Sequence, residues 1–433
     1  MLIEIHMLQN HAPSNLNRDD SGSPKECMFG GVSRSRISSQ CLKHNIRASP
    51  VFLHDMDKVA MGLRTRYLPD LVRKRLIDMG VDEQLAGIAA KVVIKFGKSG
   101  KREGGGAAEV EADEDEDMED TGDEDESDED KSDTEVSSTE SEKKKFITKQ
   151  VMFIVDEEVR GIAEVIKAKI DEKGEALESL NAKDIAKLQK EIGDKIPYII
   201  TPDIALFGRM ITSAAFKDIQ ASVQVAHAIS TNKLEREFDF FTAVDDLQKK
   251  GEDMDVEKGA GMMGDVEFNS ACFYKYFSLD CEQFIKNLAG DKPTPAEITA
   301  ATKMLEKVIR AFLRAAALTS PTGKQNTFAA HQLPDAILIE IRPFKLPISY
   351  ANAFVNPSQF RENKDLVRDS IEKFVKHVNL LNAKYKLDVT KRYWFTARDD
   401  ESITTLAIDG AEVMADFEAL VGAVIASVQG DDA

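Results

Sequence analysis

Cysteine is scarce in this sequence, and its few cysteines lack the spacing that metal sites and disulfide frameworks use. The chain of 433 residues contains only Cys27, Cys41, Cys272 and Cys281. They form no C-x-x-C pair, and no histidine stands at metal-ligand spacing from them. We therefore predict free thiols in a reducing compartment, with no bound metal and no other cofactor.

Long apolar runs and catalytic signatures are also missing. No uninterrupted apolar run approaches the length of a membrane span. The N-terminal residues MLIEIHMLQNH contain a glutamate and a histidine and lack a basic start, so they do not resemble a signal peptide. No P-loop, glycine-rich dinucleotide fingerprint or Ser-His-Asp order is visible. We expect a soluble cytoplasmic protein that is not an enzyme.

Positive charge is in deficit, but the whole deficit comes from one tract. The chain has 57 Lys and Arg against 76 Asp and Glu, which gives a formal net charge of −19. Residues 109–142 alone hold 20 acidic residues and one lysine, so the other residues sum to zero. A neutral body with clustered arginines can still bind nucleic acid, because the local field decides such binding.

The acidic tract follows a glycine-rich linker at residues 104–106 and contains no aromatic residue. A segment of this composition cannot offset the entropy cost of ordering, so we predict a disordered insertion over residues 100–145. Two roles stay open for it. It is either a solvated acidic loop or a regulator that mimics nucleic acid.

A segment with six cations and three acidic residues lies at residues 14–47, SNLNRDDSGSPKECMFGGVSRSRISSQCLKHNIR. A turn at Gly30 and Gly31 precedes the hydroxyl pair Ser38 and Ser39, a plausible N-cap for a helix over residues 40–47. Backbone N–H groups at a helix start, hydroxyls and nearby cations suit the backbone of a polyanion. An ordinary charged loop before an amphipathic helix is the alternative.

The remaining sequence mixes strand-like and helical patterns, which is typical of an α+β fold. Strand-like or buried character is expected at residues 2–8, 199–210 and 223–230, and in two runs around Pro334 within residues 327–347. Helices are expected at residues 52–96, 146–195, 294–317, 363–385 and 411–429. Apolar-alternating runs at residues 238–244 and 262–268 flank a polar stretch and predict a long β-hairpin.

Several blocks together resemble one protein family. LNRDD, FGG and SRSRISSQCLK, followed by DIALFGRM, VQVAHAIS, FDFFTAVDDL and GDVEF, occur in the order found in the CasC family. That family forms the guide-RNA-binding backbone of the type I-E CRISPR surveillance complex, Cascade. The resemblance covers blocks between residue 5 and about residue 355, and it is poor over residues 50–200.

The resemblance implies a non-catalytic subunit that polymerises head to tail along CRISPR guide RNA and presents the guide to target DNA. Its other partners would be further copies of itself and other Cascade subunits, without a membrane. The implied fold has a palm built on a modified RNA-recognition-motif sheet from residues 1–50, 201–235 and 269–433. A helical fingers domain would span residues 51–200, and a β-hairpin thumb residues 236–268.

The basic segment and the resemblance together yield a set of expected RNA-binding residues. In the basic segment these are Arg18, Lys25, Arg34, Arg36, Ser38, Ser39, Gln40, Lys43 and Arg47. Outside it, the positions that match RNA-contacting residues of the family are Met210, Phe240, Phe241, Thr242, Val244 and Met263. Several family members have tryptophan where this chain has Phe240, so stacking there is expected to be weaker. Packing of the phenylalanines into a small core is the alternative.

A basic stripe at Lys183, Lys187 and Lys190 follows helical spacing, and it suits either a solvated helix face or the backbone of double-stranded DNA. One enzymatic alternative is metal-dependent RNA cleavage, as in backbone subunits of related CRISPR effectors. The carboxylate pairs 19–20 and 245–246 would then hold the metal. A generic single-strand RNA chaperone is the third hypothesis.

Overall fold

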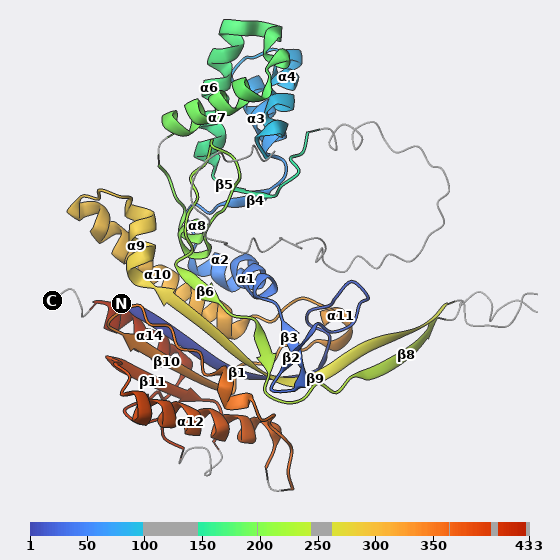
Figure 1. Ribbon diagram of the computed structural model, residues 1–433, viewed down its shortest axis with the longest axis vertical. Helices are drawn as coiled ribbons and strands as arrows, with labels where there is room; N and C mark the ends of the chain where they lie inside the picture. The colour runs from blue at the N-terminus through green and yellow to red at the C-terminus, as the bar shows by residue number, and fades with distance from the viewer. Residues whose placement is uncertain (98–145, 197, 244–261, 363, 400–405, 430–433) are drawn as a thin grey trace, which may run out of the picture.

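The computed structural model describes residues 1–97, 146–196, 198–243, 262–362, 364–399 and 406–429. A large sheet carries helices on both faces, a helical lobe stands beyond one end of it, and a two-stranded hairpin projects from its side (Figure 1). The sheet is mixed, because β11 and β12 are parallel while its other described pairs are antiparallel. The α+β class is therefore confirmed.

The main path of the sheet has the strand order β12-β11-β10-β1-β9-β7-β3-β2, and β6 and β8 also pair with β9. The strands are β1 (Leu2–Ser14), β2 (Glu26–Phe29), β3 (Val32–Ile37), β6 (Val223–Val225), β7 (Ala228–Ser230), β8 (Glu237–Ala243), β9 (Met262–Asp280), β10 (Ala336–Arg342), β11 (Lys391–Thr396) and β12 (Glu412–Val413). The helices beside it are α1 (Ser39–Ala48), α2 (Pro50–Asp55), α8 (Pro202–Phe207), α9 (Cys281–Ala289), α10 (Pro295–Leu318), α11 (Gln325–Phe328), the 3-10 turn η3 (Ala351–Phe354), α12 (Leu366–Tyr385) and α14 (Phe417–Gln429).

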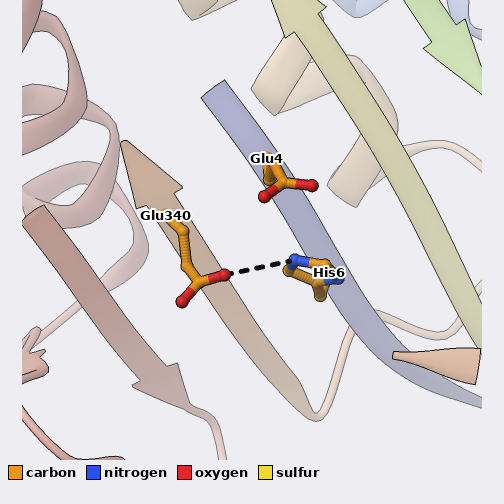
Figure 2. Close-up of side chains that lie close together, drawn as sticks. All are labelled: Glu4, His6 and Glu340. Atoms are coloured by element: carbon orange, nitrogen blue, oxygen red, sulfur yellow. Dashed lines mark ion pairs between the residues drawn. The ribbon is translucent and has the colours of Figure 1, made fainter. Parts of the chain in front are cut away.

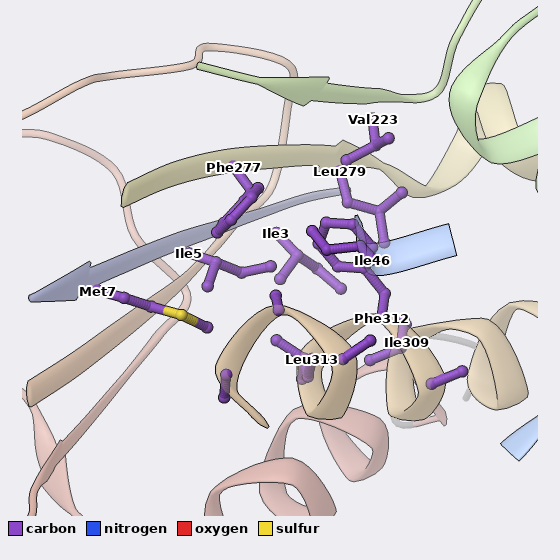
Figure 3. Packing of buried hydrophobic residues seen from close by; sticks show 14 of the residues in the cluster. Ile3, Ile5, Met7, Ile46, Val223, Phe277, Leu279, Ile309, Phe312 and Leu313 are labelled. Carbon is purple, nitrogen blue, oxygen red and sulfur yellow. The ribbon is translucent and has the colours of Figure 1, made fainter. Parts of the chain in front are cut away.

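The central strand β1 is buried on both faces, because helices cover both sides of the sheet. Ile3, Ile5 and Met7 point into the larger core with α10 (Figure 3). Leu8 lies on the opposite face, in a second core that includes residues of α12. Successive side chains of β1 therefore point to opposite faces of the sheet and pack into two separate cores.

Helix α10 carries a strong signal at its start, and its prediction is confirmed. Thr294 caps the helix, and the Glu297 carboxylate accepts a hydrogen bond from the Thr294 backbone N–H, so the two residues form a capping box. The helix buries Leu305 and Phe312, and the Phe312 ring meets Phe277 of β9 edge-on, with centroids 5.4 Å apart.

The helical lobe has a hydrophobic core of its own. It comprises α3 (Leu68–Asp78), α4 (Glu83–Val93), η1 (Ile94–Gly97), α6 (Asp156–Lys173), η2 (Gly174–Ser179), α7 (Ala182–Lys195) and the two-stranded pair β4 (Leu63–Thr65) and β5 (Met152–Ile154). The helical character predicted for this region is confirmed, but β4 and β5 were not foreseen. The lobe is joined to the segment after α8 by a buried ion pair in which Arg209 Nη1 lies 2.9 Å from Glu158 Oε1.

Some predicted strands are wrong. Within residues 199–210, where strand-like or buried character was expected, residues 202–206 are buried, but residues 202–207 form the helix α8, because Pro202 occupies its first turn, where a missing N–H costs nothing. The first of the two strands expected around Pro334 does not form: residues 325–328 make the short helix α11, bounded by left-handed backbone at Lys324 and Ala329, and residues 329–334 have no regular secondary structure. Strands β2, β3 and β11 were missed, since β3 reads VSRSRI and shows no apolar alternation.

Several predictions fall outside the described residues. They concern the acidic insertion at residues 100–145, Val244 and the carboxylate pair at residues 245–246. Among the helices that are described, none is both long enough and apolar enough to cross a membrane.

Candidate nucleic-acid interface

The basic segment is folded around the tight hairpin β2–β3. Gly30 and Gly31 at its turn have φ of 61° and 78°, a region that favours glycine. A Cβ at Gly30 would lie 2.1 Å from the backbone oxygen of Val355, so any side chain there would clash. The hairpin places Lys25 opposite Arg36, whose N–H donates to the Lys25 carbonyl at 2.8 Å.

The start of α1 meets the loop that precedes this hairpin. Ser38 is the N-cap, as predicted, and its Oγ accepts a hydrogen bond from the Cys41 N–H at 3.2 Å. The Ser38 N–H donates to Asn17 Oδ1 at 2.8 Å, which holds the loop against the helix start. Ser38 itself is buried, whereas Ser39 and Gln40 in the first turn are half-buried.

Three predicted cations gather around this helix start. Arg18, Lys25 and Arg36 are all partly exposed. Neither Arg18 nor Lys25 forms an ion pair with a residue that the structure describes. Like charges directly opposite each other on a strand pair repel, so Lys25 and Arg36 are poised for an anion between them. Their arrangement favours binding of phosphate groups.

His227 belongs to the same site and was missed by the sequence analysis. Its Nδ1 lies 3.1 Å from Arg36 Nη1 and accepts the Ser39 N–H at 3.3 Å. Two donors directed at Nδ1 favour the neutral tautomer with its proton on Nε2. The partners are about 190 residues apart in the chain, so no local pattern announces the contact.

Arg34 corrects the prediction, because it is not a surface cation. Its side chain is fully buried. The guanidinium donates to the carbonyl oxygens of Thr231 and Phe354, each at 2.7 Å, and of Ser230 at 3.1 Å. Burial lowers the pKa of Arg34. This arginine ties β3 to β7 and η3, and it is not available to an external ligand.

Lys43 and Arg47 lie farther along α1, and Arg47 faces away from the helix start. Its guanidinium stacks over the Phe153 ring at 5.1 Å and lies 3.8 Å from Asp203 Oδ2. The Arg47 side chain is 19% exposed, and burial raises the pKa of the Asp203 carboxyl. Arg47 therefore connects α1 to α8 and β5, whereas Lys43 is half-buried on the next turn back.

The predicted hairpin β8–β9 projects from the sheet and exposes apolar side chains (Figure 1). Phe240 and Met263 are each 66% exposed, and Thr242 pairs with Met263 across the ribbon. Phe241 points to the other face, where its ring covers Gly264 so closely that a Cβ there would lie 2.7 Å from the ring. None of these side chains belongs to a core cluster of the described chain.

Met210 and the lysine stripe occupy two further places. Met210 is 61% exposed on the loop after α8, directly beside the buried Arg209. Lys183, Lys187 and Lys190 are exposed on α7, opposite its buried face of Ile185, Leu188, Gln189 and Ile192. The stripe lies in the helical lobe, away from the site at the start of α1 (Figure 1).

Among the described residues, one group has the geometry of metal ligands: Glu4, His6 and Glu340, all buried (Figure 2). The chemistry of its surroundings does not fit a cation, because Arg342 donates to both carboxylates and Arg392 Nε donates to Glu340 at 2.6 Å. Burial lowers the pKa of His6 to about 3, so the imidazole is neutral. The group is a buried ion network of the sheet.

The carboxylate of Asp19 is also accounted for without a metal. Its Oδ1 accepts hydrogen bonds from the Ser21 hydroxyl at 2.6 Å and from the Ser23 N–H at 3.1 Å. These bonds, the hydroxyl of Ser21 first, lower the pKa of Asp19. Asp19 closes the turn that precedes β2.

Comparison with known proteins gives one family and a shared fold. A family model described as CT1975-like protein matches residues 3–422. A chain of a "CRISPR RNA-guided surveillance complex, pre-nicking" is 27% identical with a TM-score of 0.70, covering 99% of this chain and 100% of that one. A chain of a "CRISPR RNA-guided surveillance complex" has the same coverage, 20% identity and a TM-score of 0.62, and this likeness concerns the fold. No curated protein matches.

Proposed function

Because the chain belongs to the CT1975-like family, the CasC family of type I-E Cascade, we propose that it is the guide-RNA-binding backbone subunit of a CRISPR surveillance complex. Copies would assemble head to tail along the guide. Such heterologous contacts generate a helical filament instead of a closed ring. The guide would read target DNA by base pairing, while the protein holds the phosphate backbone.

The observation that carries the proposal is the pair of opposed cations at the start of α1. Lys25 and Arg36 face each other across the β2–β3 hairpin, and Arg18 stands on the adjoining loop. Neighbouring cations that repel each other gain most from a ligand with repeated negative charge. Ser39 and Gln40 would supply neutral hydrogen bonds there.

The projecting hairpin would act as the thumb on the RNA segment of a neighbouring copy. Phe240, Phe241, Thr242 and Met263 would wedge against bases, since stacking on an aromatic ring is worth about 1–3 kcal/mol per base. Met210, which is exposed, would also contact the RNA. The sheet would serve as the palm, related to an RNA-recognition-motif sheet.

The helical lobe would be the fingers domain, and its lysine stripe would touch the backbone of target DNA. Lys183, Lys187 and Lys190 are exposed and form no ion pair with a described residue. Their position far from the helix start of α1 suits a second nucleic acid. Lys43 would contribute to guide binding from the second turn of α1.

We propose further that the subunit does not cut RNA. The Glu4, His6 and Glu340 group is neutralised by arginines, and Asp19 is used within a turn, so neither supplies ligands for a catalytic cation. Incubating the assembled complex with magnesium and labelled complementary RNA tests this directly. Cleavage at regular intervals would establish the alternative, a nuclease backbone.

Guide binding is tested by measuring affinity for single-stranded RNA over a series of salt concentrations. Lys25→Ala should weaken binding of all sequences about equally and lower the slope of log K against log salt by about 0.7. Lys292→Ala is the matched control, because this exposed lysine precedes α10 and lies outside the site. An unchanged affinity and slope for Lys25→Ala would remove Lys25 from the interface.

A further inference from the structure

The root of the projecting hairpin is held by one arginine. Arg236 directly precedes β8, and its Nη2 lies 2.9 Å from Glu26 Oε2 of β2. Its Nη1 lies 3.3 Å from Glu267 Oε2 of β9. One guanidinium thus connects the basic hairpin β2–β3 to both arms of the projecting ribbon.

Neighbouring contacts converge on the same point. The Asn15 side-chain amide donates to the carbonyl oxygens of Gly22 and Glu267, both at 2.9 Å. The carbonyl of Glu26 accepts a hydrogen bond from Arg36 Nε at 3.3 Å. Glu26 therefore touches a cation of the candidate RNA site with its backbone and Arg236 with its carboxylate.

The ribbon needs such a restraint, because two strands alone twist and bend easily. An isolated two-stranded hairpin is marginally stable in water. Beyond Glu237 and Phe268, the described part of this ribbon pairs only with itself. Its aromatic side chains are useful on a defined nucleotide only if the ribbon leaves the sheet at a set angle.

We propose that Arg236 is a positioning residue that sets the angle between the projecting hairpin and the basic β2–β3 hairpin. By fixing this angle, Arg236 would keep a constant distance between a phosphate bound beside Arg36 and a base wedged by Phe240. This role in RNA binding rests on the function proposed above. The mechanical part of the inference, a restrained hairpin root, stands on the ion pairs alone.

The first measurement concerns the free full-length protein and needs no RNA. Amide hydrogen exchange within β8 should become faster in Arg236→Ala and stay near the wild-type rate in Arg236→Lys, which retains the charge. Arg75→Ala is the matched control, because Arg75 is 36% exposed against 35% for Arg236 and also makes a 2.9 Å ion pair. Exchange in β8 that is equal in all variants would overturn the restraint.

The second measurement uses two single-stranded RNAs, one that accommodates a single copy and one that accommodates several. Arg236→Ala should bind the short RNA as the wild type does, and its binding to the long RNA should weaken about three- to fivefold, since exposed ion pairs are individually weak. Thermal melting verifies that the variant is folded.

The outcomes separate the two proposals. A wild-type protein that does not bind RNA contradicts the proposed function, while the exchange data still decide the restraint. Weaker binding of the short RNA together with a lower salt slope would make Arg236 a phosphate ligand and end its positioning role. Unchanged binding of the long RNA by Arg236→Ala would show that the angle does not matter for assembly.

Discussion

Two arginines of strand β3, Arg34 and Arg36, stand two residues apart and have opposite surroundings. Arg34 is buried among backbone carbonyl oxygens, whereas Arg36 is partly exposed beside His227 and opposite Lys25. The same contrast separates two regions of the molecule. In the centre of the sheet Arg342 pairs with the buried carboxylates of Glu4 and Glu340, whereas the cations around the start of α1 are partly exposed.

The difference teaches that residue type alone assigns no role to a cation. Arg342 in the sheet interior offsets two buried carboxylates and contributes to stability. The partly exposed Lys25 side chain forms no ion pair with a described residue, so its removal should cost little stability. Variants in the two regions should therefore separate cleanly into losses of folding and losses of RNA affinity.

The largest effect is expected at the centre of the sheet. Arg342→Ala leaves Glu4 and Glu340 buried without their shared partner, and breaking a buried pair costs about 3–5 kcal/mol. Chemical denaturation measures the free energy of unfolding. A loss below about 1 kcal/mol would mean that the network relaxes or takes up water, and the contrast between the regions would weaken.

Arg34→Ala should be the next most damaging change. It deprives the carbonyls of Thr231 and Phe354 of their donor, and leaving buried polar groups unsatisfied costs about 1–3 kcal/mol. Arg36→Ala is its natural control and should change stability by less than about 0.5 kcal/mol while weakening RNA binding. Equal melting temperatures for the two variants would contradict the claim that Arg34 stabilises the fold and Arg36 does not.

The buried histidine should make stability depend on pH. The folded-state pKa of His6 is about 3 and lies below its ordinary value of 6.5, so the unfolded chain takes up the proton first as pH falls. Above about pH 6.5 His6 is neutral in both states and does not lower the free energy of unfolding. At pH 5 proton uptake by the unfolded chain lowers that free energy by about 2 kcal/mol. His6→Gln should remove this part of the pH dependence in denaturation curves measured between pH 7 and pH 5.

Only a small effect on folding is expected at the projecting hairpin. Replacing Phe240 and Phe241 by alanine should lower stability by less than about 1 kcal/mol, since neither side chain packs into a core of the described chain. Assembly on a long RNA should nevertheless be impaired. A stability loss of several kcal/mol would show that these residues stabilise the fold and would contradict their proposed role as a wedge against RNA bases.

Local signals predicted the elements that contain capping residues or a regular hydrophobic alternation. The Ser38 and Ser39 pair marks the start of α1, and alternation marks the two arms of the hairpin. These signals work because capping and alternation depend on residues close together in the chain. Elements without them, such as β3, were missed.

The contacts that define the site could not be predicted in the same way. The burial of Arg34 depends on carbonyls of residues 230, 231 and 354, and the position of His227 depends on how β7 pairs with β3. Such pairings are set by sheet order, which no short segment encodes. Sequence reasoning therefore found the cations but could not distinguish a structural cation from a surface one.

Strand β9 is continuous from the projecting hairpin into the centre of the sheet, and this has a mechanical consequence. Its inner half is paired with β1 from Leu2 and Asp280 to His11 and Ala271. A pull on the hairpin along the strand loads all these hydrogen bonds in shear, so they must break together and not one after another. A hairpin anchored in this way would resist tension better than one held only by exposed contacts.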